Sequence, residues 1–352
     1  MKYYAGLDVS LNSTALCIVN QDGDIIHESE VSSEPEAIDD WLTNKGLPME
    51  RVGLEAGTTS PWLCHALLAL KWPAICIETR HAKAAMAAQN VKTDRNDARG
   101  IAHIMRTGWF RAVHVKSHES QKLRVLLGNR RCLLDKQLDL QNQIRGTIKV
   151  FGLKVGKVTT ATYDRRIREL IEDHRELQNY IFPMLEVLRH LVEQTKRLEK
   201  MILQYVRQDQ VCRLFMTIPG VGPLTALAFK TFVDGHGRFK HSRSVGAALG
   251  LTPRKYASGE VDYDGRITKC GDTFVRSHLF EAASALGAGR EKQHAQGVGT
   301  AYCQAQFAEK RMRSCCAPAG GHHARHVARR NGVPTWGHRM SIQACCSVTR
   351  EA

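Results

Sequence analysis

The stretch Lys92-Thr93-Asp94-Arg95-Asn96-Asp97-Ala98 decides how the amino-terminal part of this chain is interpreted. It places Asp94 and Asp97 three residues apart at the start of a helix expected over 98–106. Side chains at i and i+3 share one helical face, so both carboxylates can point at one spot. They repel each other unless a cation lies between them, and hard oxygen ligands suit Mg²⁺ or Mn²⁺. Taken alone, such a pair is more often a helix-capping and dipole feature.

Two further acids precede this stretch, each in or at the end of an apolar segment. Residues 3–9 are expected to form a buried strand that carries one acid, and residues 51–55 a second strand that ends in another. A carboxylate in such a place is costly unless it is paired or bound to metal. The order strand Asp, strand-end Glu, helix Asp-x-x-Asp is that of the ribonuclease H/RuvC two-metal site for phosphoryl transfer. The predicted catalytic metal ligands are therefore Asp8, Glu55, Asp94 and Asp97.

Composition points to a nucleic-acid partner. The chain has 352 residues, enough for two domains with hydrophobic cores. Its net charge of +15 and pI of about 9.4 favour a polyanionic partner. The sequence shows no signal-peptide pattern and no apolar run of membrane-spanning length, so a bacterial cytoplasmic, nucleoid-associated protein is expected.

The apolar pattern of the first 90 residues predicts an α/β sheet of the ribonuclease H type. Three antiparallel strands followed by alternating helix and strand are typical of that arrangement. The expected strands cover residues 3–9, 15–20, 25–29, 51–55 and 74–78, and the expected helices include 35–44 and 81–89.

Residues 116–149 show a long helical pattern, in which Leu and Ile recur at spacings that fit a 3.6-residue period. Basic side chains lie between them. Such a face is usually just solvated, but in a chain of charge +15 phosphate contact is an equally open interpretation. The candidate contacts are Lys122, Arg124, Arg130, Arg131, Arg145 and Lys149.

A heptad repeat runs from Leu177 to Tyr205 and predicts a coiled coil. Its partner could be the 116–149 helix of the same chain or another subunit. We expect the repeat to contribute to a homo-oligomer, either a dimer or a tetramer. Pro183 inside the pattern is expected to kink or restart the helix.

A glycine-rich turn and a serine-containing loop mark a further functional region. Ile218-Pro219-Gly220-Val221-Gly222-Pro223 resembles a helix-hairpin-helix turn, in which Gly220 and Gly222 would let backbone N–H groups approach a phosphate. An ordinary turn between helices is the alternative. Further on, Ser258 precedes a glycine in a basic loop, where on chemical grounds it is more often a turn residue than a nucleophile. The loop's candidate nucleic-acid contacts are Arg254, Lys255 and Lys269.

Two blocks of the sequence together resemble the IS110/IS1111 family of transposases. Gly6-Leu7-Asp8, Leu54-Glu55 and the 92–98 stretch look like that family's DEDD domain. The segment from Ile218-Pro219-Gly220-Val221-Gly222 to Lys269-Cys270-Gly271-Asp272 looks like its C-terminal transposase domain. The resemblance covers residues 1 to about 296, with both blocks in the family's order and spacing.

This resemblance implies a recombinase that excises and inserts its own DNA element as an oligomer, guided by a structured non-coding RNA, the bridge RNA. It implies Mg²⁺ at the four acids and maps the family's serine nucleophile best onto Ser258. Two alternatives remain open. One is a RuvC-like structure-specific nuclease that only hydrolyses DNA, and the other is an inactive transposase remnant that still binds nucleic acid.

We therefore expect four segments. These are a RuvC-like DEDD domain at 1–115, long helices with a coiled coil at 116–209, a small, mostly α C-terminal transposase domain with a helix-hairpin-helix-like element at 210–296, and a tail at 297–352. The composition of the tail changes abruptly, and two stretches of it can be back-translated so that a one-nucleotide shift gives family-like sequence. We interpret the tail as frameshifted and disordered, so that the activity of this copy could be lost.

Overall fold

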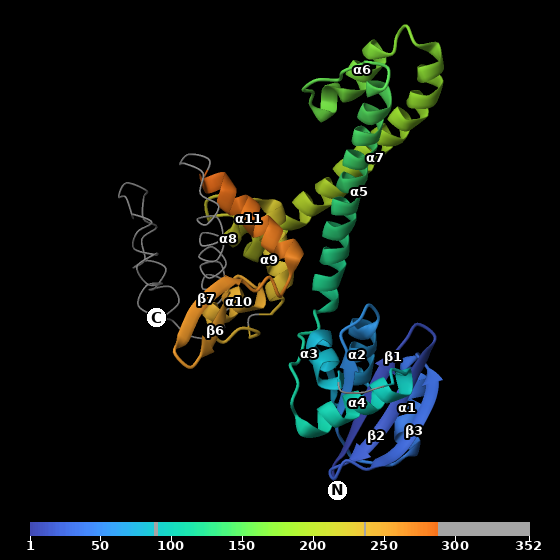
Figure 1. The fold of residues 1–352 in the computed structure, drawn as a ribbon, viewed down its shortest axis with the longest axis vertical. Coiled ribbons are helices and arrows are strands. Elements are labelled where there is room, and N and C mark those ends of the chain that lie inside the picture. Colours follow the sequence, from blue (N-terminus) through green and yellow to red (C-terminus); the bar gives the residue numbers. More distant parts are fainter. Residues whose placement is uncertain (88–90, 236, 288–352) are drawn as a thin grey trace. The chain divides into compact units, whose positions relative to one another are not determined.

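The computed structural model describes residues 1–87, 91–235 and 237–287. They belong to two compact units, one of which is Met1–Lys116 and the other of which begins at Ser117 (Figure 1). The interpretation of residues 297–352 as a frameshifted, disordered tail lies outside the described residues. In the part of the chain that is described, no helix is long and apolar enough to span a bilayer.

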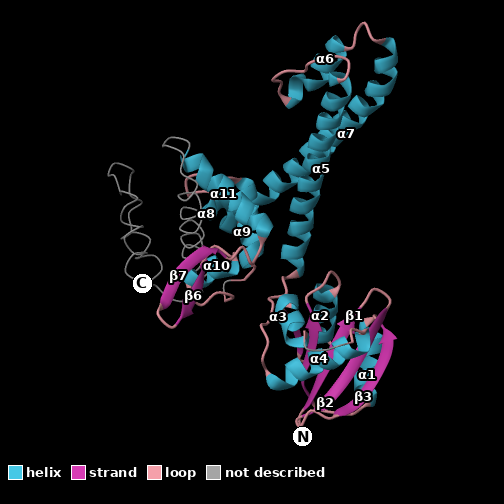
Figure 2. Cartoon of the chain, viewed as in Figure 1, coloured by secondary structure: helices cyan, strands magenta, loops and turns pink. Residues whose placement is uncertain are grey.

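The first unit is built on a five-stranded sheet, drawn as magenta arrows in Figure 2. Its strands are β1 (Tyr3–Val9), β2 (Ser13–Asn20), β3 (Ile25–Ser32), β4 (Met49–Glu55) and β5 (Ala74–Ile77). Their order is β3-β2-β1-β4-β5, in which β2 runs antiparallel to both neighbours while β1, β4 and β5 run parallel. This strand order is of the ribonuclease H type and confirms the fold predicted for the amino-terminal part.

Helices cover both faces of this sheet. They are α1 (Pro35–Asn44), α2 (Ser60–Ala69), α3 (Thr79–Met86) and α4 (Asp94–Thr107). One core contains Leu7 and Leu54 together with residues of α1 and α2, and another contains Tyr4 together with residues of α3 and α4. Because side chains alternate along a strand, β1 turns Leu7 to one face and Tyr4, Gly6 and Asp8 to the face covered by α4.

Helix α4 begins four residues earlier than the sequence pattern indicated. Thr93 caps it, since its hydroxyl accepts a hydrogen bond from the Asn96 amide at 3.2 Å. Both Asp94 and Asp97 therefore lie in the first turn of the helix. The apolar period alone marks only the buried part of a helix, so it missed this polar first turn.

The second unit consists mainly of helices. They are α5 (His118–Lys149), α6 (Thr160–Leu170), α7 (Arg175–Gln208), α8 (Gln210–Phe215), α9 (Pro223–Val233), α10 (Ser242–Ala248) and α11 (Thr273–Gly287). Two strands, β6 (Pro253–Ser258) and β7 (Val261–Ile267), form an antiparallel hairpin. The sequence had indicated only a loop there. A half-buried strand shows apolar alternation, but here nearly every side chain is exposed and that signal is missing.

The long helices α5 and α7 pack along each other (Figure 1). In α7 one series of heptad positions is buried, namely Ile181, Leu188, Thr195 and Ile202. Gln137 of α5 donates hydrogen bonds to the Leu191 carbonyl and to the Thr195 hydroxyl. The repeat is thus used at least partly inside the chain, and its part in self-association stays a prediction. Helix α7 continues through Pro183 and does not restart there.

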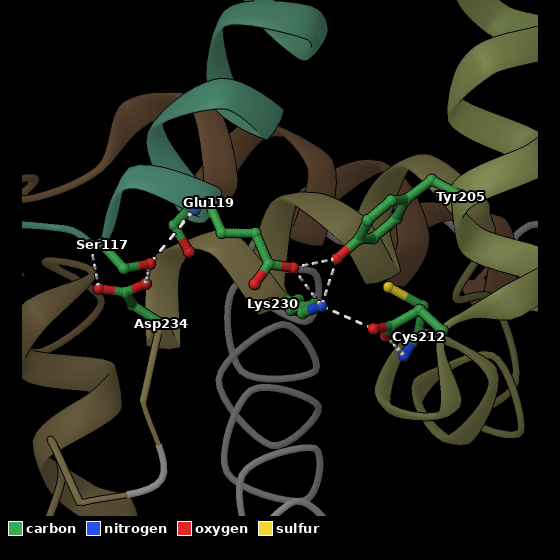
Figure 3. Close-up of polar contacts among 8 residues, drawn as sticks. Ser117, Glu119, Tyr205, Cys212, Lys230 and Asp234 are labelled. Atoms are coloured by element: carbon green, nitrogen blue, oxygen red, sulfur yellow. Dashed lines mark hydrogen bonds and ion pairs between the residues drawn. The ribbon is translucent and has the colours of Figure 1, made fainter.

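A polar network joins the ends of four helices in the second unit (Figure 3). Lys230 of α9 donates to the Asp209 carboxylate and to the Tyr205 hydroxyl, both at 2.6 Å. Tyr205 in turn donates to Glu119 of α5 at 2.5 Å. Nearby, Asp234 accepts hydrogen bonds from the Ser117 amide and hydroxyl at 2.8 and 2.5 Å. These contacts tie α5, α7 and α8 to α9.

Candidate active site

Strands β1 and β4 are neighbours in the first sheet and carry two of the predicted acids at their carboxyl ends. The parallel register pairs Leu7 with Leu54, so the next residue on each strand, Asp8 and Glu55, lies at the same level. Leu7 and Leu54 face α1 and α2. Alternation therefore turns Asp8 and Glu55 towards the face covered by α4.

Two glycines let α4 pack directly on these strands. A Cβ at Gly6 would lie 2.2 Å from the Ala98 carbonyl oxygen and 2.3 Å from the Ala102 nitrogen. On the neighbouring strand, a Cβ at Gly53 would lie 2.5 Å from Cγ of Met105. Any larger side chain at Gly6 would push the helix backbone away. This close packing brings the first turn of α4, with its two aspartates, to the strand ends.

The carboxylates influence one another electrostatically. Burial, followed by the negative charges of Asp97 and Asp94, raises the pKa of Asp8 to about 6, while Lys92 acts in the opposite direction. Burial raises the pKa of Glu55 as well, followed by the charges of Asp8 and Asp97. Repulsion of this kind is what a bound cation relieves. The donor set is made of hard carboxylate oxygens, so it fits Mg²⁺ or Mn²⁺.

The acids are near neighbours without forming a closed coordination shell. Within residues 1–87, 91–235 and 237–287, no three His, Cys, Asp or Glu side chains are gathered closely enough to hold a metal ion. The assignment of Asp8, Glu55, Asp94 and Asp97 as metal ligands therefore stays a prediction. The carboxylates would have to draw together to complete the shell.

The hydroxyl groups of Ser60 and Thr79 hold the end of β4, and the sequence pattern did not indicate this role. Ser60 donates to the Glu55 carbonyl at 2.5 Å and accepts from the Gly57 amide at 2.8 Å. Thr79 donates to the Ala56 carbonyl at 2.9 Å. A serine before a proline often caps a helix, but α2 begins at Ser60 itself and the Ser60 hydroxyl binds the strand end instead. The Ser-Pro signal is compatible with both arrangements.

An ion pair between α4 and β3 was also missed. Glu28 accepts hydrogen bonds from the guanidinium of Arg99, one of them at 2.8 Å, and forms an ion pair with Arg95 at 3.0 Å. The hydrogen bond from Arg99 is the largest effect that lowers the pKa of Glu28. The pair holds the first half of α4 against the sheet. No spacing rule connects a strand residue with a helix about 70 residues later.

Ser258 is the last residue of β6 and lies opposite Val261. A two-residue turn follows, in which Gly259 has φ +57°, a conformation that glycine adopts readily. The structure thus places Ser258 at the exposed tip of a hairpin. Lys255 forms an ion pair with Asp262 at 3.0 Å on the opposite side of this hairpin. The roles of Ser258 and Lys255 in catalysis and DNA contact stay predictions.

Several arginines of α5 have partners within the chain. Arg130 forms an ion pair with Glu199 of α7, and Arg124 with Asp272 at 2.8 Å. Arg131 pairs with Asp135, while Arg145 donates to the Gly156 carbonyl. These contacts stabilise the second unit and compete with phosphate contact. Lys122 and Lys149 are exposed on the helix surface.

The glycine-rich turn connects α8 with α9. Gly220 has φ +81°, and Gly222 is the N-cap residue of α9. Two helices joined by a glycine-containing turn are therefore present here, and the helix-hairpin-helix interpretation stays a prediction. The positive φ of Gly220 is a structural reason for a glycine at that position. A contact between this turn and a phosphate stays a prediction.

The strand order and the carboxylates at its edge define the first unit as a ribonuclease H-like domain. Two family models match the chain, "Transposase" of the DEDD IS110 type over residues 5–152 and "Transposase IS116/IS110/IS902 family" over residues 212–296. The chain belongs to the IS110/IS1111 family of transposases.

Named relatives agree with this assignment. The transposase for insertion sequence element IS1111A of Coxiella burnetii is 27% identical over 286 residues, which are 80% of this chain and 77% of the relative. A "Probable family 20 transposase" of Pseudomonas aeruginosa is 30% identical over 202 residues, which are 55% of this chain and 59% of the relative. Among solved structures, Thermus thermophilus RuvC is similar at 15% identity and a TM-score of 0.25, covering 32% of this chain and 99% of RuvC.

Proposed function

We propose that this chain is a DNA transposase that moves an insertion sequence by metal-dependent phosphoryl transfer. The observation that carries the proposal is the approach of α4 to the ends of β1 and β4, which brings Asp94 and Asp97 towards Asp8 and Glu55. The raised pKa of Asp8, about 6, supports a shared site in which the carboxylates repel one another. The relatives named as transposases support the choice of DNA as substrate.

In this proposal Asp8, Glu55, Asp94 and Asp97 hold Mg²⁺ or Mn²⁺. Such ions, when bound, favour the attack of an oxygen on phosphorus and the departure of the leaving oxygen. The chain itself supplies the positions of the ligands. Gly6 allows the close approach of α4, and Ser60 fixes the backbone at Glu55.

Ser258 is the proposed nucleophile. Its hydroxyl oxygen forms a bond to the phosphorus of one DNA strand while a P–O bond of that strand breaks, and the released oxygen takes up a proton. The serine must lose its own proton as it attacks. Support comes from the exposed position of Ser258 at the tip of the β6–β7 hairpin.

Guidance by a structured RNA and assembly into a homo-oligomer belong to the same proposal. The net charge of +15 supports binding to more than one nucleic acid strand. A family member of this kind would act in the cytoplasm on the bacterial nucleoid. The DNA that flanks the gene is the natural substrate for tests, because it contains the element ends and any RNA-coding region.

The experiment combines DNA cleavage with detection of a covalent adduct. Asp94→Asn should abolish cleavage while binding to DNA stays nearly unchanged, and Ser258→Ala should abolish the protein–DNA adduct. If Asp94→Asn cleaves as well as the parent, the metal assignment is wrong. Cleavage by the parent without any adduct favours the RuvC-like nuclease, and binding without cleavage under all conditions favours the inactive remnant.

A further inference from the structure

The β6–β7 hairpin carries its aromatic residues on the same face as Ser258. Because side chains alternate along a strand, Arg254, Tyr256 and Ser258 share one face of β6. The ladder pairs Tyr256 with Tyr263 and Ser258 with Val261, so these partners lie on that face too. Neither aspartate of the two strands lies on this face, and Arg254 does.

The opposite face has a different character. It carries Lys255, which forms an ion pair with Asp262 at 3.0 Å and lies opposite Asp264 in the ladder. Both carboxylates of the two strands therefore lie on this face. A phosphate backbone would be repelled from that face, so a DNA strand that reaches the hairpin meets less repulsion on the Ser258 face.

The two tyrosines form a stack in which Tyr263 is the more exposed residue. Their ring centroids are 5.0 Å apart and the rings are inclined by 18°. Tyr256 also lies against Gly265, where a Cβ would come within 2.9 Å of its ring. Cross-strand aromatic pairs stabilise hairpins, which accounts for the contact between the rings. Tyr263 nevertheless remains 55% exposed, so it has surface available for a further ring.

We propose that Tyr263 stacks one unpaired nucleobase of the DNA strand that is attacked by Ser258. The inference rests on the proposed function. Tyr263 and Ser258 are diagonal neighbours on one face, a separation of about 7–8 Å, which one nucleotide can span from base to phosphate. Stacking on tyrosine is available to every base, so it positions the strand without reading its sequence. Arg254, on the same face, contacts the backbone of that strand.

The test uses the full-length protein and single-stranded oligonucleotides of mixed sequence, each with one 5-iododeoxyuridine. Irradiation and peptide mass spectrometry should locate a crosslink at Tyr263. Tyr263→Leu should weaken binding between about five- and a hundred-fold, while Tyr263→Phe keeps the ring and binds like the parent. Phe151→Leu is the matched control, because Phe151 is also exposed but lies just beyond the end of α5.

A second measurement separates stacking from folding of the hairpin. An abasic nucleotide at the crosslinked position should weaken binding of the parent by the same factor, yet leave binding of Tyr263→Leu unchanged. A parent that crosslinks elsewhere, or a Tyr263→Leu variant that still discriminates against the abasic strand, overturns the proposal. The Ser258 adduct is scored separately. An adduct without a Tyr263 crosslink overturns the stacking alone, and a crosslink without an adduct overturns the serine chemistry alone.

Discussion

The Ala98 carbonyl lies so close to Gly6 that a Cβ on Gly6 would be only 2.2 Å from its oxygen. This contact sets the distance between α4 and β1, and with it the distance between the aspartates of α4 and Asp8. The neighbouring Gly53, paired with Gly6 in the sheet register, meets only the flexible side chain of Met105.

We expect Gly6→Ala to destabilise the first unit more than Gly53→Ala does. The methyl group at Gly6 must displace helix backbone, which costs about 1–3 kcal/mol. At Gly53, Met105 can change its rotamer, so the loss should be smaller. Denaturant unfolding of both variants measures the difference. Equal losses would show that the packing of α4 on β1 is not the constraint described above.

The Glu28–Arg99 contact should make the first unit sensitive to acid. The pKa of Glu28 is lowered in the folded state, so its contribution is complete above the ordinary value of 4.5 and is lost as pH falls through the lower, folded value. Glu28→Gln should cost about 1 kcal/mol at neutral pH and flatten the pH dependence below 4.5. Glu30→Gln, on the same strand and exposed, is the control. If the stability of Glu28→Gln falls below pH 4.5 as steeply as that of the parent, the role given to Glu28 is wrong.

Lys230→Met should destabilise the second unit by about 2–3 kcal/mol, because it leaves the mostly buried Asp209 carboxylate without its cation. Adding Asp209→Asn should restore part of that loss. The asparagine oxygen can still cap α8, where Asp209 accepts from the Cys212 amide at 2.7 Å. Thermal unfolding of the single and double variants tests this. A double variant less stable than Lys230→Met would show that the ion pair is not what matters.

Binding to DNA and to RNA should weaken steeply with salt. Six or more phosphate contacts would cost about 10³-fold in affinity between about 50 and 200 mM salt. Lys122→Gln should reduce the slope of log affinity against log salt concentration by about the contribution of one phosphate contact, because Lys122 is exposed on α5. Arg130→Gln should change stability rather than slope, since Arg130 forms an ion pair with Glu199. Affinities that hardly respond to salt would rule out a phosphate-dominated interface.

Self-association should depend on the exposed positions of α7. Tyr180, Val187 and Met201 are exposed and share a heptad spacing, whereas Leu191 is partly buried against the same chain. Leu191→Asp should weaken an assembly, but it would also disturb the α5–α7 pair. Val187→Asp is the more specific test, because it adds a charge only to the exposed stripe formed by Tyr180, Val187 and Met201. Light scattering that gives Val187→Asp the mass of the parent would show that this stripe is not an interface.

Sequence patterns were sufficient for the elements with a clear apolar signal. The strand carrying Asp8 and the strand ending in Glu55 were recognised as short apolar runs, which are buried on both faces of the sheet. The long helices were recognised because apolar residues recur along one side of each. The order of the acids along the chain also indicated the ribonuclease H-type sheet. Local spacing decides these features, so the sequence contains them directly.

Only the tertiary structure decided the contacts between segments distant in the chain. It paired Arg130 with Glu199, Glu28 with Arg99, and the Ser60 hydroxyl with the end of β4. It also showed that the stretch around Ser258 is a hairpin with an aromatic face. An exposed hairpin buries too little to leave an apolar period, and an ion pair across about 70 residues follows from packing rather than from spacing. For these features the sequence supplied the residues, and the fold determined their partners.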